Sequence, residues 1–234
     1  MPNRFSKSRS EAQHGKAQDE PQEMILLTVA RAEENSQRIT IDDLARELDL
    51  PRPLVSARLA PLLEQSQLQS LPDGSFALSA TGRSRALALL RRHRLTERLF
   101  TDVLGLDWAQ AHEEADRIEH EVSPEAEQQL ATQLGEPDTC PHGNPIPRAT
   151  GDWDHGALTP LAVCAGGTRA TIARIGLETP AALRHLATLG LLPNVEIEIE
   201  NKAPFSGPLM VRVGRAHYAL GHGLAARIWV RLSN

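Results

Sequence analysis

The residues with metal-binding chemistry gather in one stretch of the chain, His112-Glu113-Glu114-Ala115-Asp116-Arg117-Ile118-Glu119-His120. An α-helix turns about 100° per residue, so His112, Asp116, Glu119 and His120 would fall within an arc of roughly 100°. Two imidazoles and two carboxylates would then share one helix face. Earlier in the chain, His93 and Glu97 stand at the i, i+4 spacing that also places two side chains on one face. Such nitrogen and oxygen donors suit a divalent first-row metal ion.

A hydrolase site is the alternative interpretation of the same residues. The run His112-Glu113-x-x-Asp116 approaches the zinc-protease pattern, in which two His at i, i+4 bind zinc and the Glu acts as the base. Here Asp116 replaces the second His, and Glu113 points away from the face that His112 and Asp116 share. We therefore expect a binding protein and not an enzyme, and keep a metallohydrolase as the alternative.

The elements that precede this stretch predict a DNA-binding unit. A helical pattern begins near Pro21, and two short helices follow, the first starting at Thr40 as its cap and the second running from about Arg52 to Gln65. Pro61 is expected to kink or end the second helix early. Segments 68–71 and 75–78 are joined by a Pro-Asp-Gly turn and predict a β-hairpin. Two helices across a tight turn, followed by a hairpin, are typical of a winged helix.

Charge divides the middle of the chain into two parts. Segment 83–98 carries six arginines and one acid, whereas segment 111–129 carries seven acids and one arginine. The first part is expected either to contact phosphate or to form a solvated helix face, and the second to attract cations.

The spacing of hydrophobic residues changes in the last part of the chain. Residues 136–158 are rich in Pro, Gly and Asp and predict a linker or an ordered loop. Beyond them a helix with Thr179 as its cap and Gly190 as its stop lies among predicted strands. Those strands are Thr168–Ile175, Val195–Glu200, Leu209–Val213 and Ile228–Leu232. The pattern favours a small, mostly β barrel.

Composition narrows the class of protein. The chain has 234 residues, 41% hydrophobic and 24% charged, with a formal net charge of −5, so any nucleic-acid contact must be local. Its two cysteines, Cys140 and Cys164, form no disulfide framework and favour a reducing cytoplasm. We expect no membrane span, no secretory signal and no small organic substrate, and we expect residues 1–20 to form a disordered tail.

Several motifs closely resemble the diphtheria-toxin-repressor family of metal-activated bacterial transcription regulators, over roughly residues 22–147. They are Arg91–Leu99, Asp102–Leu106, His112–Ala115, Glu119-His120 and Cys140-Pro-His-Gly-Asn-Pro-Ile-Pro147. The C-terminal part looks like the SH3-like domain of ferrous-iron-transport A (FeoA) proteins. Its motifs are Leu189-Gly-Leu-Leu-Pro193, Ala203-Pro-Phe-Ser-Gly-Pro208 and Ala219-Leu-Gly221.

The resemblance implies a mainly α fold with a small β part. After the tail at 1–20, it implies a winged helix-turn-helix domain at 21–79 and a helical dimerisation and metal-binding domain at 80–142. A linker at 143–158 and an SH3-like, FeoA-type β-barrel at 159–234 would follow. Helices between 98 and 130, with Leu99, Val103, Leu104 and Trp108, would supply the dimer interface.

The resemblance also implies two metal sites per subunit. The ancillary site would hold His93, Glu97 and His112, completed by Glu178 from the SH3-like domain. The primary, activating site would hold Met24, Asp116, Glu119 and His120. Asp116 stands where toxin-repressor-type members have a Cys, and a hard carboxylate favours Mn²⁺, while the Met24 thioether pulls weakly toward softer ions. We therefore expect Mn²⁺ or Fe²⁺.

The implied function is a metal-activated repressor of metal-uptake genes that binds double-stranded operator DNA as a homodimer. The expected DNA contacts are Arg52, Pro53, Ser56 and Arg58. A metal-transport accessory protein is a further alternative, suggested by the C-terminal part alone, although residues 39–78 argue against it. Cys140 and His142 resemble a metal pair, but their surroundings favour a structural loop.

Overall fold

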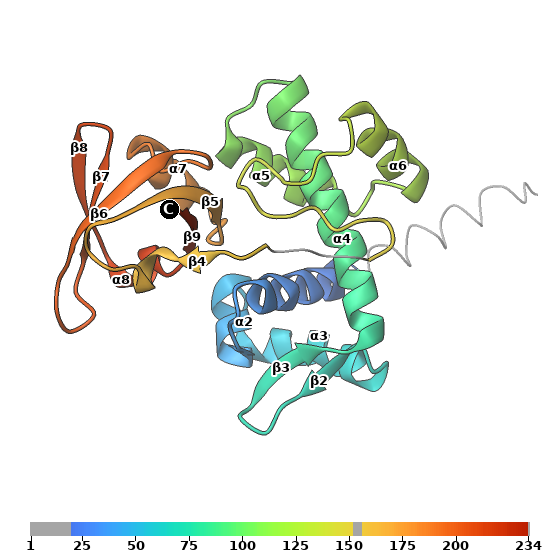
Figure 1. Ribbon diagram of the computed structural model, residues 1–234. Helices are drawn as coiled ribbons and strands as arrows, with labels where there is room; N and C mark the ends of the chain where they lie inside the picture. The colour runs from blue at the N-terminus through green and yellow to red at the C-terminus, as the bar shows by residue number, and fades with distance from the viewer. Residues whose placement is uncertain (1–19, 152–155, 234) are drawn as a thin grey trace, which may run out of the picture. The chain divides into compact units, whose positions relative to one another are not determined.

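A computed structural model describes residues 20–151 and 156–233 (Figure 1). The predicted tail at 1–20 therefore lies outside the described residues, except for Glu20. The described chain forms two compact units: residues 20–91 with 149–151, and residues 92–148 with 156–233. Helix α4 (Ala80–Arg98) contributes residues to both units.

The first unit is the predicted winged helix. A helix covers residues 20–34 and is followed by α2 (Ile41–Glu47) and α3 (Arg52–Glu64). The strands β1 (Ile39–Thr40), β2 (Leu68–Ser70) and β3 (Ser75–Leu78) form an antiparallel sheet in the order β1-β3-β2. In Figure 1 the β2–β3 hairpin extends beside α3, as a wing does.

Local sequence explains where α2 and α3 begin and end. Thr40 closes a capping box on α2, because its side chain accepts from the Asp43 N–H while the Asp43 carboxylate accepts from the Thr40 N–H. Helix α3 directs Val55, Leu59 and Leu62 into the core. Pro61 does not end α3 early, since the helix continues to Glu64, and the other expectation, a kink at Pro61, stays a prediction. One lost hydrogen bond is outweighed by the burial of Leu59 and Leu62 on either side of it.

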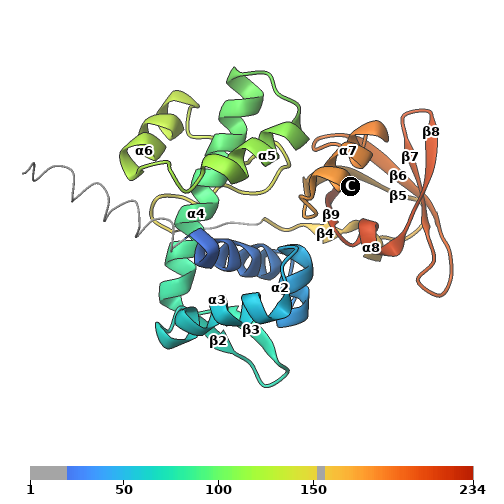
Figure 2. The same ribbon diagram turned by 180° about the vertical axis from the view of Figure 1, so that it is seen from behind.

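The helical part of the second unit is built around the C-terminal half of α4. That helix continues into a π-helical turn, η1 (Leu99–Val103), and α5 (Trp108–Ile118) and α6 (Pro124–Gln133) follow. Figures 1 and 2 show α5 and α6 on opposite sides of α4. Asp107 caps α5 by accepting from the N–H groups of Ala109 and Gln110. Because α5 ends at Ile118, the helical face predicted through His120 stops short of that residue.

The C-terminal part of the second unit is an SH3-like antiparallel sheet with the strand order β4-β9-β5-β6-β7-β8. Its elements are β4 (Thr159–Pro160), η2 (Leu161–Val163), β5 (Thr168–Ile175), α7 (Pro180–Thr188), β6 (Glu196–Lys202), β7 (Leu209–Val213), β8 (Ala216–Leu220), α8 (His222–Ala225) and β9 (Ile228–Leu232). Strand β8 is not predicted by the sequence pattern, because four of its five residues are not buried and its apolar pattern is weak.

The sheet core is aliphatic and extends into α5. Ile172, Ile199 and Val230 are fully buried in the same cluster as Ala109, and Trp108 packs against that cluster. The expectation that Trp108 lies in a dimer interface stays a prediction, because its ring is only partly buried by this cluster. No helix within residues 20–151 and 156–233 is both long and apolar enough to cross a membrane.

Candidate metal centre

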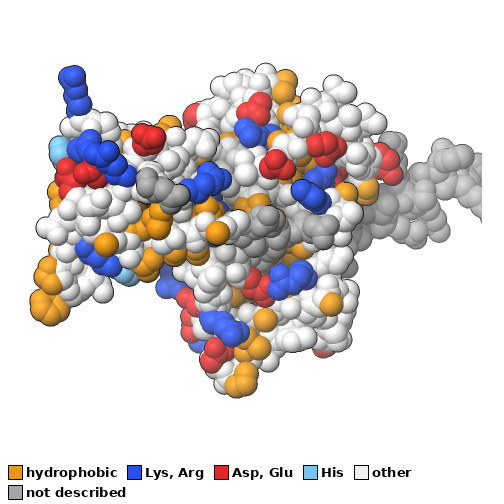
Figure 3. All heavy atoms as spheres, in the orientation of Figure 1, with side chains coloured by type: hydrophobic (Ala, Val, Ile, Leu, Met, Phe, Trp, Pro, Cys, Tyr) orange, Lys and Arg blue, Asp and Glu red, His pale blue; other side chains and the backbone are white. Residues whose placement is uncertain are grey.

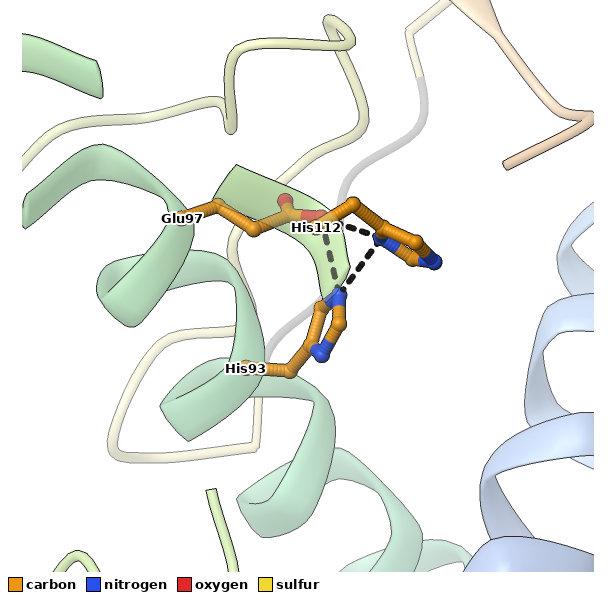
Figure 4. A group of neighbouring side chains, drawn as sticks. All are labelled: His93, Glu97 and His112. Carbon is orange, nitrogen blue, oxygen red and sulfur yellow. Dashed lines mark hydrogen bonds and ion pairs between the residues drawn. The ribbon is translucent and has the colours of Figure 1, made fainter. Parts of the chain in front are cut away.

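Two helices of the second unit bring two imidazoles onto one carboxylate oxygen. His93 and Glu97 lie one turn apart on α4, and His112 lies on α5. Glu97 Oε1 is 2.8 Å from His93 Nε2 and 2.7 Å from His112 Nδ1, and the two nitrogens are 3.1 Å apart (Figure 4). All three side chains are buried. The structure thus brings together three of the four predicted ancillary ligands.

This donor set fits a divalent cation. A neutral imidazole carries one N–H, and a carboxylate only accepts, so lone pairs converge where these three side chains meet. Glu97 Oε2 is buried without a hydrogen-bond partner among the described residues. Buried acceptors of this kind are costly unless something positive binds them. A metal ion with nitrogen and oxygen ligands would meet that need.

The opposite edge of the His93 ring faces the predicted primary ligands. His93 Nδ1 is 2.5 Å from Glu119 Oε2 and 3.3 Å from Asp116 Oδ1. Glu119 is fully buried, whereas the Asp116 side chain is 34% exposed. His120 Nε2 is 3.5 Å from Glu119 Oε1. His93 therefore contacts members of both predicted sites, which the sequence pattern alone did not indicate.

Met24 belongs to the other unit. It lies in the helix over residues 20–34, is partly exposed, and accepts a hydrogen bond at its carbonyl from Thr28 Oγ1. Its place in the primary site remains a prediction.

A loop after α6 adds two donors, Cys140 and His142, that belong to neither predicted site. His142 Nδ1 is 3.3 Å from Glu97 Oε1 and 3.6 Å from Cys140 Sγ. Glu178, the predicted outside ligand, accepts a hydrogen bond from Asn144 Nδ2, and its Oε1 is 3.9 Å from His142 Nδ1. The Cys140-x-His142 spacing was the available signal, but only the fold shows that Glu97 lies beside it.

Burial and charge set the protonation of this group in the absence of metal. Burial alone would raise the pKa of Glu97, but the positive charges of His142 and His93 and the hydrogen bond from His112 bring it well below its usual value. Burial opposes the charged form of His142, yet the Glu97 carboxylate raises the His142 pKa well above its usual value. Burial and the Glu97 charge raise the pKa of Cys140 to about 11. Without metal, Glu97 and His142 therefore form a buried ion pair beside a protonated thiol.

The predicted DNA contacts lie on or near the exposed face of α3. Arg52, Pro53 and Ser56 are exposed, Arg58 is half-buried, and Val55 and Leu59 face the core. Arg52 lies 2.9 Å from the exposed Asp42 carboxylate, so the pair is open to solvent.

The arginines of α4 have partners within the chain. Arg85 pairs with Glu23 at 3.0 Å, Arg83 pairs with Glu33, and Arg98 donates to the Thr139 carbonyl at 2.8 Å. Figure 3 accordingly shows Lys and Arg side chains scattered among Asp and Glu on the face it presents. The expected phosphate-binding role of segment 83–98 is thus weakened.

Comparisons with known proteins agree with this arrangement. A model described as "Iron dependent repressor, metal binding and dimerisation domain" matches residues 79–148, and a FeoA domain model matches residues 159–232. The chain is 31% identical over 220 residues to the "Iron-dependent repressor IdeR" of Mycobacterium tuberculosis (strain ATCC 25618 / H37Rv), covering 89% of this chain and 95% of the relative. It is 44% identical over 125 residues to the "Diphtheria toxin repressor" of Corynebacterium jeikeium (strain K411), covering 53% of this chain and 52% of the relative.

Two solved structures are similar over most of the chain. One is titled "Manganese-dependent transcriptional repressor complex with manganese" and matches with a TM-score of 0.83 and 31% identity, covering 91% of this chain and 100% of that one. The other is the crystal structure of T. acidophilum IdeR, with a TM-score of 0.81 and 29% identity, covering 90% and 97%.

Proposed function

The chain belongs to the family of metal-dependent transcriptional repressors that includes the iron-dependent repressor and the diphtheria toxin repressor, and from this premise we propose that it represses metal-uptake genes when a divalent cation is bound. Members of this family are regulators and not enzymes. The observation that carries the proposal is the convergence of His93, Glu97 and His112 on one buried point of a chain that also has a winged helix.

We propose two metal sites per subunit. His93, Glu97, His112 and Glu178 would hold the ancillary ion, and Met24, Asp116, Glu119 and His120 the primary one. A bound cation would neutralise the negative charge that these carboxylates bring together. Asp116 is a hard oxygen donor, which favours Mn²⁺, with Fe²⁺ as the second candidate.

The protein's own residues would make DNA binding depend on the bound cation. Glu119 and Asp116 lie close to one imidazole edge, and without a cation their like charges repel. A cation that binds one arrangement of the chain more tightly than others shifts the population toward that arrangement. In our proposal this arrangement holds the winged helices of a homodimer at the half-site spacing of operator DNA in the cytoplasm.

The DNA contacts in this proposal come from the N-terminal half of α3. Arg52 and Ser56 are exposed and one turn apart, beside the buried face of Val55 and Leu59. Pro53 and Arg58 flank them. Such a helix in the major groove presents its N-terminal residues to base edges.

A metallohydrolase fits the geometry less well. The base that it would need, Glu113, is paired with Arg184 at 3.2 Å, away from the His112 ring. A transport accessory role would leave the winged helix without a purpose.

The test measures operator binding by fluorescence anisotropy with Mn²⁺, Fe²⁺, Zn²⁺ or excess chelator, using DNA from upstream of metal-uptake genes. We expect tight binding with Mn²⁺ or Fe²⁺ and a large loss with chelator. Because Arg52 is proposed as a direct contact, Arg52→Ala should weaken binding about tenfold, in line with about 1–3 kcal/mol for one good contact. Binding that chelator leaves unchanged would refute the proposal.

A further inference from the structure

We infer that Leu54 on α3 recognises thymine in the operator, by packing its side chain against the C5-methyl group of that base in the major groove. This role for Leu54 deepens the proposed function and rests on it, because α3 must bind operator DNA for the contact to form. It adds a specificity-determining residue to the proposed contacts at Arg52, Pro53, Ser56 and Arg58, and it names the base that this residue selects.

Leu54 is a large apolar side chain that the fold leaves in solvent. It is 41% exposed, and the other large apolar side chains of the described residues that are exposed all belong to the second unit. Val55, Leu59 and Leu62 of the same helix lie in the core, whereas Leu54 is neither in that cluster nor among the described side chains that pack against it. Folding therefore gains little from a leucine here, while a DNA complex would bury it.

The position of Leu54 along α3 is the one from which a side chain reaches base edges. The helix begins at Arg52, so Leu54 lies in its first turn, and the N-terminal residues of a recognition helix contact the bases. At about 100° per residue, Pro53, Ala57 and Ala60 lie opposite the core, with Leu54 at the edge of that outward face. All four are exposed. Because the three outward residues are small, the helix can approach the bases closely, and the longer Leu54 side chain would contact them.

The charges around Leu54 suit a DNA groove. Residues 52–63 contain two arginines and no acid, and the first turn of α3 has no acidic residue. The partial positive charge of the helix N-terminus therefore stays available to phosphate groups. Asp42 on α2 pairs with Arg52 at 2.9 Å, but the two side chains are 68% and 62% exposed, so the guanidinium can exchange this partner for DNA.

The residue types of α3 restrict which bases it can recognise directly. Residues 52–63 include no Asn or Gln, the amides that pair with adenine, and no Asp or Glu, which accept from cytosine. Arginine recognises guanine, and an apolar side chain recognises the thymine methyl group. Thymine is therefore the base that Leu54 can distinguish. Uracil lacks only this methyl group, so it is the matched probe for the contact.

The experiment compares operator DNA from upstream of metal-uptake genes with the same DNA in which deoxyuridine replaces every thymidine. Binding of the full-length protein is measured by fluorescence anisotropy with excess Mn²⁺ or Fe²⁺. The burial of one methyl group changes affinity by about fourfold. Since a dimer contacts two half-sites, we expect wild type to bind the uracil DNA more than about tenfold more weakly. Single replacements then locate the thymines that matter.

The variant Leu54→Ala removes the contact while leaving the core intact. We expect its ratio of affinities for thymine and uracil DNA to fall below about twofold, with its affinity for uracil DNA close to that of wild type. The matched control is Leu192→Ala, the same change at a leucine of the second unit that is 36% exposed, and it should keep the wild-type ratio. Thermal unfolding of both variants should match wild type, because both side chains are exposed.

Two results would overturn this role for Leu54 while the proposed function stands. In one, wild type binds thymine and uracil DNA equally well, and the binding still depends on the metal. In the other, Leu54→Ala discriminates between the two DNAs as strongly as wild type does. Failure of wild type to bind any thymine operator with Mn²⁺ or Fe²⁺ is a different result, which refutes the proposed function and the contact with it.

Discussion

Single residues determine what the metal centre can do, and His93 is the most constrained of them. Its ring is fully buried, with Nε2 toward Glu97 and His112 and Nδ1 toward Glu119 and Asp116. A change of charge beside one ring nitrogen must therefore alter the electrostatic environment of the carboxylates beside the other. Glu97 has a similar role between His93 and His142, because its Oε1 contacts both rings.

At this scale we predict that Glu119→Gln impairs metal activation more than Glu97→Gln does. Both changes keep the side-chain shape and remove a buried negative charge, but Glu119 belongs to the group proposed to activate the protein. We expect the Mn²⁺ concentration for half-maximal operator binding to rise by more than about tenfold in Glu119→Gln. Glu113→Gln, at the exposed pair with Arg184, should match wild type. Equal losses in the two buried variants would contradict the ranking of the sites.

Individual elements show how local chemistry positions these residues. The capping box at Thr40 starts α2, and Asp107 starts α5 at the point from which His112 reaches α4. The π-helical turn η1 begins at Leu99, directly after the end of α4 and two residues beyond Glu97. Short π-helical turns of this kind are frequent near functional sites.

At the scale of an element, we predict that Thr40→Ala destabilises the winged-helix unit by about 1 kcal/mol, whereas Thr40→Ser does not. The hydrogen bonds from the Thr40 side chain and backbone lower the pKa of Asp43. A lowered folded-state pKa gives stability that is present above the ordinary value of 3.8 and is lost as the pH falls through the folded value.

Urea unfolding at about pH 7 and about pH 3 measures both effects. Wild type should lose part of the Asp43 contribution at the lower pH, and Thr40→Ala, which has already lost the side-chain part of it, should lose less. A pH dependence as steep in Thr40→Ala as in wild type would show that the capping box does not lower the pKa of Asp43.

The whole molecule adds surfaces that no single element contains. Trp108 packs on the sheet core, which leaves Val103 and Leu104 as the apolar side chains of the predicted interface that are most exposed, at 63% and 59%. Large exposed apolar side chains that lie together commonly mark an interaction surface. The three-domain division predicted from the sequence stays a prediction, since the described chain groups into two compact units.

We predict that Leu104→Asp weakens self-association by at least about tenfold, which corresponds to about 1.4 kcal/mol, because a charge would be buried in the contact. Sedimentation velocity over a range of concentrations measures this effect. The control is Phe205→Asp, the same kind of change at a fully exposed position in the β6–β7 loop. If both variants associate like wild type, the interface lies elsewhere.

The sequence by itself determined the local structure and the chemical nature of the centre. The capping residues, the turn chemistry and the i, i+4 pairs act over a few residues, so the helices, the hairpin and the His93–Glu97 pair could be recognised without coordinates. The same local rules did not predict that α3 continues past Pro61, where the packing of its apolar side chains keeps it helical. They also did not predict that α5 ends at Ile118, before the end of the periodic run of metal-binding side chains.

Only the tertiary structure decided which donors meet. Glu97, Cys140 and Glu178 are far apart along the chain, and their proximity results from the docking of a rigid loop onto β5. Contacts of that kind depend on how several elements pack at once, which no spacing within the sequence encodes. For this reason Cys140 and His142 looked like an ordinary loop until the fold placed a buried carboxylate beside them.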